Sequence, residues 1–198
     1  MILTLIRHGL TEGNIKGLYY GSTDIPLASE GVRQLETFRD EGGYPKAKRY
    51  YTSGMLRTEQ TLKILYGDVP HEALTDLREI DLGDFEMRSY EQLKGDPAFI
   101  EWITGDNEAN VCPNGESGNA VTARALAAIK RIAKAGEDAV VITHSGVIGG
   151  VLSRLVGAGT RYDYKAEPGC GFMLEFENGS LQRIIKTVPD VRARSDAE

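Results

Sequence analysis

Two histidines stand where a reactive side chain would be expected. His8 follows residues 2–7, which begin with an apolar run, and His144 follows the apolar run at 139–143. A neutral imidazole is a nucleophile near pH 7 and can also exchange a proton there. Ligands of open α/β folds bind beyond the carboxyl ends of the strands, so both positions suit chemistry. The pattern predicts that the two imidazoles converge at one edge of a sheet.

The charge balance limits the kinds of ligand. The 198 residues include 23 Lys plus Arg and 29 Asp plus Glu, a formal net charge of −6. This balance provides no basic field for nucleic acid or for an anionic membrane, and we expect neither as a partner. An anionic ligand must therefore meet a local group of arginines. No apolar run reaches membrane-spanning length, and the first six residues are too short for a signal-peptide core, so we expect a cytoplasmic protein.

The same residues also allow interpretations without chemistry. A lone histidine is more often a satisfied polar group, and we expect His71, which follows no strand, to be structural. Two histidines in matched settings favour a site. No His-x-x-x-His or Cys-x-x-Cys spacing occurs, so we expect neither a metal nor another cofactor. Cys112 and Cys170 indicate no disulfide framework and fit a reduced compartment.

Strands and helices alternate along the chain. We predict buried strands over 2–6, 48–52 and 139–143, and a hairpin of 171–177 with 181–185 joined by Asn178-Gly179. Helices are predicted over 30–39 with Ser29 as the N-cap, over 56–66, over 117–135 with Gly136 as the stop, and over 147–155. This alternation predicts an α/β fold, a three-layer α/β/α sandwich with a mostly parallel mixed sheet.

The chain shows no composition break, so we predict one domain over residues 1–190 and a disordered tail over 191–198. Residues 75–112 have weak periodicity and an isolated apolar cluster at 99–103. We predict that they form a semi-irregular excursion or lid that contributes to substrate choice. The sequence leaves open whether residues 96–112 move and whether the chain forms a homodimer.

At this point the motifs resemble a known family. Arg7-His8-Gly9-Leu10-Thr11-Glu12-Gly13-Asn14 is similar to the Arg-His-Gly-x-Thr-x-x-Asn signature of the histidine phosphatase superfamily, also called phosphoglycerate mutase-like. The resemblance continues, in order, through residues 20–27 with Gly31, 52–61, 77–86, 114–117 and 141–146. Six blocks therefore cover most of the chain.

The resemblance implies a set of roles. His8 would accept the phosphoryl group as a phosphohistidine, Glu79 would donate a proton to the leaving oxygen, and Arg7, Arg57 and His144 would surround the phosphate. The implied substrate-binding positions are Gly9, Asn14, Tyr20, Gly21, Ser145 and Gly146. Planar guanidiniums suit phosphate because they bind its oxygens in pairs.

Four of these substrate-binding positions carry more specific expectations. The amide of Asn14 would bond a phosphate oxygen, and Gly9 and Gly146 would let the backbone approach closely. Ser145 and Gly146 open a helix whose N-terminal N–H groups favour anions.

The blocks at 20–27 and 77–83 are most similar to those of α-ribazole phosphatases. Cofactor-dependent phosphoglycerate mutases usually have Trp after the Gly of the second block, whereas here Ser22 follows Gly21. Residues 96–110 contain no Lys or Arg that could bind a second phosphate. We therefore expect hydrolysis of a small phosphomonoester. The alternatives are a phosphoglycerate mutase and, from another class, a non-catalytic regulator that binds phosphate esters.

One position departs from the family pattern. Where many relatives have Trp-Glu-Gly after the acid, this chain has Phe85-Glu86-Met87. The loop loses the backbone freedom of a glycine, which predicts a reshaped loop.

Overall fold

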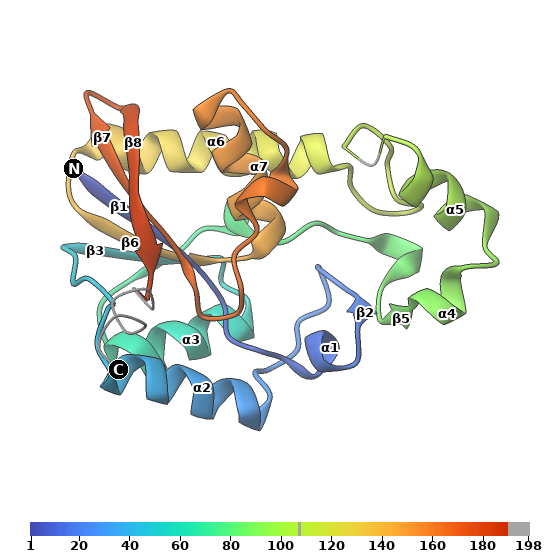
Figure 1. Ribbon diagram of the computed structural model, residues 1–198, viewed down its shortest axis with the longest axis horizontal. Helices are drawn as coiled ribbons and strands as arrows, with labels where there is room; N and C mark the ends of the chain where they lie inside the picture. The colour runs from blue at the N-terminus through green and yellow to red at the C-terminus, as the bar shows by residue number, and fades with distance from the viewer. Residues whose placement is uncertain (107, 190–198) are drawn as a thin grey trace, which may run out of the picture.

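A six-stranded mixed sheet forms the centre of the structure (Figure 1), a computed structural model that describes residues 1–106 and 108–189. The strands are β1 (Ile2–Arg7), β3 (Arg49–Thr52), β4 (Glu72–Ala73), β6 (Ala139–Thr143), β7 (Gly171–Glu177) and β8 (Ser180–Val188). Their order across the sheet is β4-β3-β6-β1-β7-β8. The first four strands in this order are parallel to one another. β7 is antiparallel to β1, and β8 is antiparallel to β7. The predicted mostly parallel mixed sheet is confirmed.

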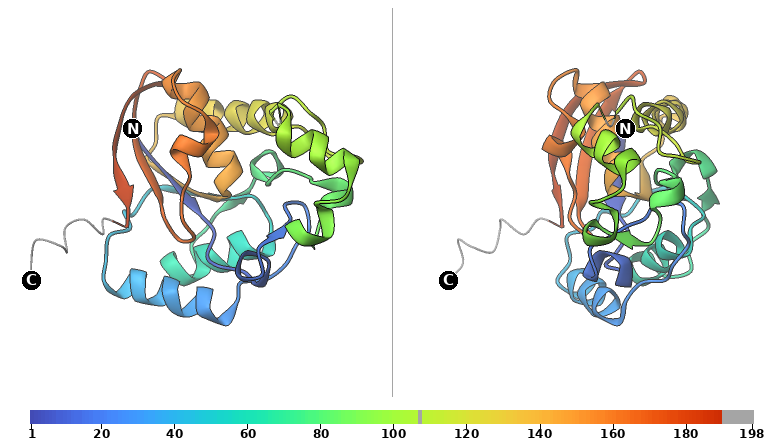
Figure 2. Two further views of the ribbon diagram at one scale, coloured as in Figure 1. Left: turned by 45° about the vertical axis from the view of Figure 1, so that its right-hand side comes forward. Right: turned by 90° about the vertical axis from the view of Figure 1, so that its right-hand side faces the viewer.

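Two pairs of helices cover the two faces of the sheet (Figure 2). α2 (Ser29–Asp40) and α3 (Leu56–Tyr66) cover one face, and α6 (Gly118–Ala135) and α7 (Ser145–Val156) cover the other. Residues of β1 alternate between two cores, because Leu5 packs with the α6 and α7 side and Ile6 with the α2 and α3 side. The three-layer α/β/α sandwich is therefore confirmed.

Most predicted elements lie where the sequence placed them, with differences at their ends. Ser117 caps α6 by accepting a hydrogen bond from Ala120 N, and Gly136 ends it with left-handed backbone. The prediction of Ser29 as an N-cap is wrong, because α2 starts at Ser29 and its N-cap is Ala28, which has no side-chain cap. Tertiary pairing sets this start: Ala28 N donates to Leu10 O at 2.9 Å.

The C-terminal predictions have mixed outcomes. The predicted hairpin is present as β7 and β8, and α7 starts two residues earlier than expected, at Ser145. The tail predicted over residues 191–198 lies outside the described residues, and the single domain over 1–190 stays a prediction. Within the described residues, no helix is both long enough and apolar enough to span a membrane.

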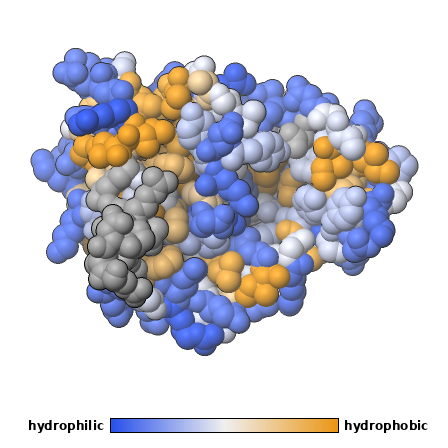
Figure 3. All heavy atoms as spheres, viewed as in Figure 1, coloured by the Kyte–Doolittle hydropathy of each residue, from blue (hydrophilic) through white to orange (hydrophobic). Residues whose placement is uncertain are grey.

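The segment predicted as an excursion has a small core of its own. It contains η1 (Thr75–Leu77), η2 (Gly83–Phe85), β5 (Arg88–Ser89), α4 (Tyr90–Leu93) and α5 (Pro97–Thr104), next to α1 (Glu12–Ile15) and β2 (Leu18–Tyr19). β5 pairs with β2, and Phe85 and Phe99 are buried together. Hydrophobic side chains also reach the surface at the end that carries α4 and α5 (Figure 3), where Ile100 is exposed.

Met87 occupies the position where the family resemblance leads us to expect glycine. Its φ is 58°, the left-handed conformation that glycine adopts without strain. Its N–H donates to Tyr19 O at 2.7 Å beside the β2–β5 pair. Met87 thus adopts a backbone conformation that suits glycine, and its backbone is strained as a result. The residue is 39% exposed.

We expect Met87→Gly to be more stable than Met87→Ala by about 1 kcal/mol, because both remove the side chain and a left-handed non-glycine residue costs roughly this much. Urea unfolding would measure the change. Met87→Ala is the matched control, since it removes the side chain and keeps the strain. Equal stability of the two variants would contradict the assignment of strain to this residue.

Candidate active site

The parallel pairing of β1 with β6 brings the two predicted histidines together. Arg7 lies opposite Thr143 in the register, so His8 and His144 leave the sheet side by side. Their ring centroids are 5.2 Å apart with an interplanar angle of 62°, and both side chains are buried. The predicted convergence of the two imidazoles is therefore confirmed.

His8 is held in one orientation by its own backbone neighbourhood. Its Nδ1 lies 2.7 Å from Gly9 O, and because a carbonyl only accepts, Nδ1 carries the proton. Nε2 is then the nitrogen with a free lone pair. The main chain is fixed as well, since His8 N donates to Thr143 O and Gly9 N donates to Thr61 Oγ1 at 3.0 Å. Gly9 thus orients the imidazole, and the space beside its Cα is filled by Leu35.

The electrostatic setting keeps His8 neutral. Burial, followed by the nearby charges of Arg57 and Arg7, holds the pKa of His8 well below 6.5. Burial, Arg57, His8 and Arg7 likewise lower the pKa of His144. Both rings are therefore neutral near pH 7, as a nitrogen nucleophile requires.

His144 bonds through one nitrogen only. Its Nε2 lies 2.9 Å from Ser53 Oγ, and its buried Nδ1 has no hydrogen-bond partner among the described residues. When Ser53 donates its proton to Nε2, Nδ1 carries the ring proton and becomes a donor.

Arg57 comes from the first turn of α3 and is completely buried. It donates to Gly21 O at 2.7 Å and to Thr23 O at 3.0 Å, and its guanidinium lies over the Tyr20 ring, 5.3 Å from the centroid. Burial lowers the pKa of Arg57, yet a guanidinium stays charged at neutral pH. The predicted positions Tyr20 and Gly21 therefore hold Arg57 in place.

Arg7 lies at the end of β1 and donates to Ala166 O at 2.9 Å. Its hydrogen-bond acceptor is a neutral carbonyl, so its charge is not cancelled there. Arg57 also donates to carbonyls, and its ion pair with Asp24 is long, at 3.9 Å. Burial lowers the pKa of Arg7, and Glu79 is the largest opposing influence. Arg7, Arg57 and Glu79 therefore lie within electrostatic reach of one another.

Unpaired buried donors mark the centre of this group. Among the described residues, five buried side-chain nitrogen or oxygen atoms have no hydrogen-bond partner, and three of them are Arg7 Nε, Arg57 Nε and His144 Nδ1. Buried polar groups are rarely left unpaired, because each costs about 1–3 kcal/mol. A ligand with several acceptor oxygens, such as a phosphate, would satisfy such donors.

Glu79 is held by two backbone N–H groups. Its Oε1 accepts from Ile80 N and its Oε2 from Gly146 N, both at 3.0 Å. The N-terminal N–H groups of α7 were expected to favour anions, and at Gly146 the bound anion is this carboxylate of the protein itself. The substrate-binding role of Gly146 stays a prediction. A Cβ at Gly146 would lie 2.6 Å from Glu79 Oε1, so glycine is needed for the contact.

Two other predicted substrate-binding residues have structural bonds. Asn14 Oδ1 accepts from Thr11 N at 3.2 Å in a capping box around α1, which leaves its Nδ2 as the group that could donate to a phosphate. Ser145 Oγ donates to Ala166 O at 3.3 Å, the same carbonyl that Arg7 uses. His71 is half-exposed and bonds Glu59, away from these residues.

The sequence reasoning missed a carboxylate that organises the site. Glu86 accepts hydrogen bonds from the backbone N–H of Gly21, Ser22, Thr23 and Leu82, at 2.8 to 3.1 Å. It thereby holds the loop whose carbonyls bind Arg57. Arg124 holds the backbone around Glu79 in a similar way, because it donates to the backbone oxygens of residues 76, 78 and 79. Only the family blocks, which include residue 86, could have drawn attention to Glu86.

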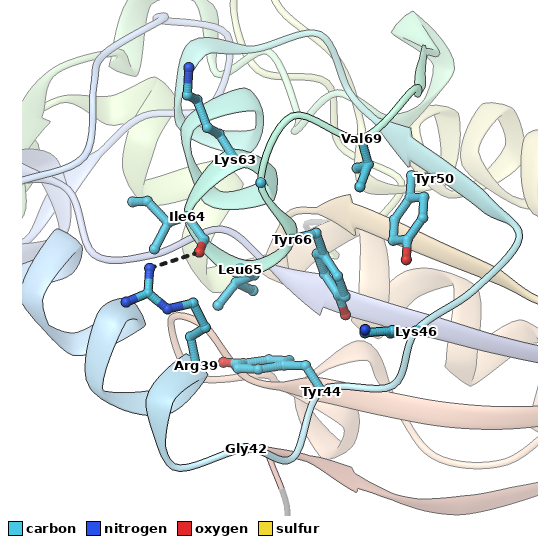
Figure 4. Close-up of a pocket in the computed structure, with 11 residues that line it drawn as sticks. Arg39, Gly42, Tyr44, Lys46, Tyr50, Lys63, Ile64, Leu65, Tyr66 and Val69 are labelled. Carbon is cyan, nitrogen blue, oxygen red and sulfur yellow. Dashed lines mark hydrogen bonds between the residues drawn. The ribbon is translucent and has the colours of Figure 1, made fainter.

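Two cavities differ in what lines them. A cavity of about 220 Å³ adjoins the site and is lined by Tyr20, Glu79 and Gly146 among others. A larger one, about 590 Å³, lies between α2 and α3 (Figure 4), where Arg39 donates to Ile64 O at 3.4 Å. Its lining, with Tyr44 and Tyr66, includes none of the predicted site residues. The smaller cavity is therefore the one that belongs to the candidate active site.

Comparisons with known proteins agree with this geometry. Residues 3–184 match the sequence profile of the histidine phosphatase superfamily (branch 1). The chain is 32% identical over 187 residues to an adenosylcobalamin/alpha-ribazole phosphatase of Salmonella typhimurium, covering 90% of this chain and 92% of that one. It is 29% identical over 187 residues to a probable phosphoglycerate mutase of Yersinia enterocolitica, covering 91% and 82%.

A solved structure has the same fold. The crystal structure of a putative alpha-ribazole-5'-P phosphatase from Escherichia coli superposes with a TM-score of 0.84 at 26% identity, over 93% of this chain and 95% of that one. The fold and the sequence match together confirm the predicted resemblance: the chain belongs to the histidine phosphatase superfamily.

Proposed function

We propose that this protein hydrolyses a small phosphomonoester through a phosphohistidine on His8, without a metal ion. The observation that carries the proposal is a buried, neutral imidazole beside two guanidiniums whose Nε groups are unpaired. The imidazole supplies the nucleophile, and the guanidiniums supply the charge that a transferring phosphoryl group needs.

The reaction would proceed in two steps. In the first, His8 Nε2 attacks phosphorus, the phosphorus–oxygen ester bond breaks, and Glu79 gives its proton to the departing alcohol oxygen. In the second, Glu79 takes a proton from water, the hydroxide adds to phosphorus, and the bond to Nε2 breaks to release inorganic phosphate. Arg7, Arg57 and His144 Nδ1 would donate to the phosphoryl oxygens in both steps.

The relatives support α-ribazole 5′-phosphate as the substrate. A Salmonella and an Escherichia coli protein that match nearly the whole chain are both described as α-ribazole phosphatases. The Yersinia match to a probable phosphoglycerate mutase keeps mutase action as the second candidate. A location in the cytoplasm is part of the proposal, and the two free cysteines fit a reducing compartment.

His8→Ala should lower phosphatase activity on p-nitrophenyl phosphate below about one thousandth of the wild-type value, because it removes Nε2, the atom that would bond to phosphorus. The wild type should show full activity in EDTA and form an acid-labile phosphoenzyme. His71→Ala, a histidine outside the site, is the control and should stay active. Hydrolysis that stops in EDTA, or a phosphoenzyme that survives in the His8 variant, would contradict the mechanism.

Glu79→Gln should reduce kcat/KM for an alkyl phosphate about a hundredfold more than for p-nitrophenyl phosphate, because the alkoxide needs the proton and the nitrophenolate leaves without it. Steady-state kinetics with the two esters would measure the ratio. The same loss for both esters would mean that Glu79 only holds the backbone of α7.

The pH dependence of activity should reflect the lowered pKa of His8. An ordinary histidine becomes protonated below pH 6.5 and would lose about tenfold in kcat/KM per pH unit. Burial and the two arginines keep His8 neutral further down, so kcat/KM for p-nitrophenyl phosphate should not fall between pH 7 and about 5.5. A tenfold loss per unit that begins at pH 6.5 would argue against a neutral His8.

A further inference from the structure

The cavity beside Glu79 has walls suited to an apolar group. Its lining includes Ile80, Leu82, Trp102 and Tyr162, which come from the 80–82 segment, α5 and η3 (Arg161–Tyr164). Glu79, the residue expected to contact the leaving oxygen, forms part of the same wall. The alcohol portion of a bound ester would therefore occupy this cavity.

Trp102 adds a specific feature to this wall. Its indole Nε1 is buried and has no hydrogen-bond partner among the described residues. The ring packs against Tyr19, Phe85 and Phe99, so its position is set by the small core of the excursion. A rigid aromatic surface of this kind favours flat ligands.

The one cation among the residues that line this cavity is already neutralised. Arg161 donates from Nε and from its terminal nitrogen to the two carboxylate oxygens of Glu108, and also to Thr122 Oγ1 at 3.3 Å. The two side chains of the ion pair are only 12% and 36% exposed. A bidentate pair cancels the charge that Arg161 would otherwise present to an anionic group on the substrate.

The ion pair packs against the first residue of α6. A Cβ at Gly118, the first residue of α6, would lie 2.5 Å from the Arg161 guanidinium and 2.8 Å from Glu108 Oε2. Asn119 N donates to Glu108 O at 2.8 Å, which fixes the backbone of the carboxylate. The side chains of Arg161 and Glu108 are therefore held in these conformations by their surroundings.

We propose that this cavity selects esters with a flat, apolar alcohol, and that Glu108 excludes esters with an anionic alcohol by neutralising Arg161. The inference rests on the proposed phosphatase function and names its substrate class. Trp102 and Arg161 contact the alcohol, and Glu108 is a positioning residue that acts through Arg161.

Three primary alkyl phosphates separate the effect from leaving-group chemistry, because their alcohols are similar in reactivity. The esters are 2-phenylethyl phosphate, glycerol 3-phosphate and 3-phosphoglycerate. We expect kcat/KM of the wild type to be highest for the phenylethyl ester, about tenfold above glycerol 3-phosphate, since an apolar ring is buried. 3-Phosphoglycerate should be the poorest substrate.

Glu108→Gln tests the role of the ion pair. The amide keeps the shape and removes the negative charge, so the ratio of kcat/KM for 3-phosphoglycerate to that for glycerol 3-phosphate should rise about fivefold. Glu101→Gln is the matched control: it makes the same charge change on the exposed side of α5, and it should leave the ratio unchanged. In each variant the ratio compares an ester of an anionic alcohol with an ester of a neutral alcohol. A loss of protein stability alone would lower both rates and leave this ratio unchanged.

The outcomes distinguish the two proposals. If the wild type does not hydrolyse p-nitrophenyl phosphate, the proposed function fails and this inference falls with it. If it hydrolyses that ester but treats the three alkyl esters alike, the substrate class is wrong and the phosphatase function stands. A ratio that is unchanged in Glu108→Gln, or that rises equally in Glu101→Gln, overturns the role of Glu108.

Discussion

The parallel pairing of β1 with β6 is the contact on which the site depends. It joins two strands that are more than 130 positions apart in the chain, and its register sets Arg7 opposite Thr143. Both strands are buried on both faces, so a shift of the register by one residue would turn the apolar side chains into the wrong core. The hydrophobic cores on the two sides therefore also fix the distance between His8 and His144.

Burial of two charged guanidiniums is unfavourable in free energy, and a bound anion would offset this cost. Burial disfavours the charged state of Arg7 and Arg57. Both donate their hydrogen bonds to carbonyls, and the one ion pair of Arg57, with Asp24, is long at 3.9 Å. Carbonyl partners orient these guanidiniums without cancelling their charge. An incoming phosphate then meets donors that are already in place, which is the arrangement that electrostatic preorganisation requires. Glu86 is indispensable to this arrangement because it holds the loop that supplies two of the carbonyls.

The sequence was sufficient for the main strands and helices and for the two strand-end histidines, because strand periodicity and strand-end chemistry are local signals. Arg57 and Glu79 were expected only from the family resemblance. The sequence could not show which backbone N–H groups would form hydrogen bonds with other parts of the protein. The N-terminal N–H groups of α7 were expected to favour an anion, and tertiary packing places the Glu79 carboxylate at the N–H of Gly146. Ser29 was expected to cap a helix, and the pairing of the 27–28 segment with the 10–11 segment moved the start. Such outcomes depend on contacts between segments distant in sequence, which no local pattern records.

The arginines around the site differ in the partners that they bond. Arg161 and Arg124 each bond the carboxylate of a glutamate, Glu108 and Glu116, and are thereby neutralised. Arg7 and Arg57 donate to carbonyls, the Asp24 carboxylate lies no closer than 3.9 Å to Arg57, and each guanidinium retains a buried, unpaired Nε–H. The residue type is the same in all four, so the partner decides which guanidinium can bind an anion. The consequence is spatial: positive charge is available where the phosphoryl group would be transferred and is withheld where the alcohol would lie, so a second anionic group on the substrate finds no counter-charge.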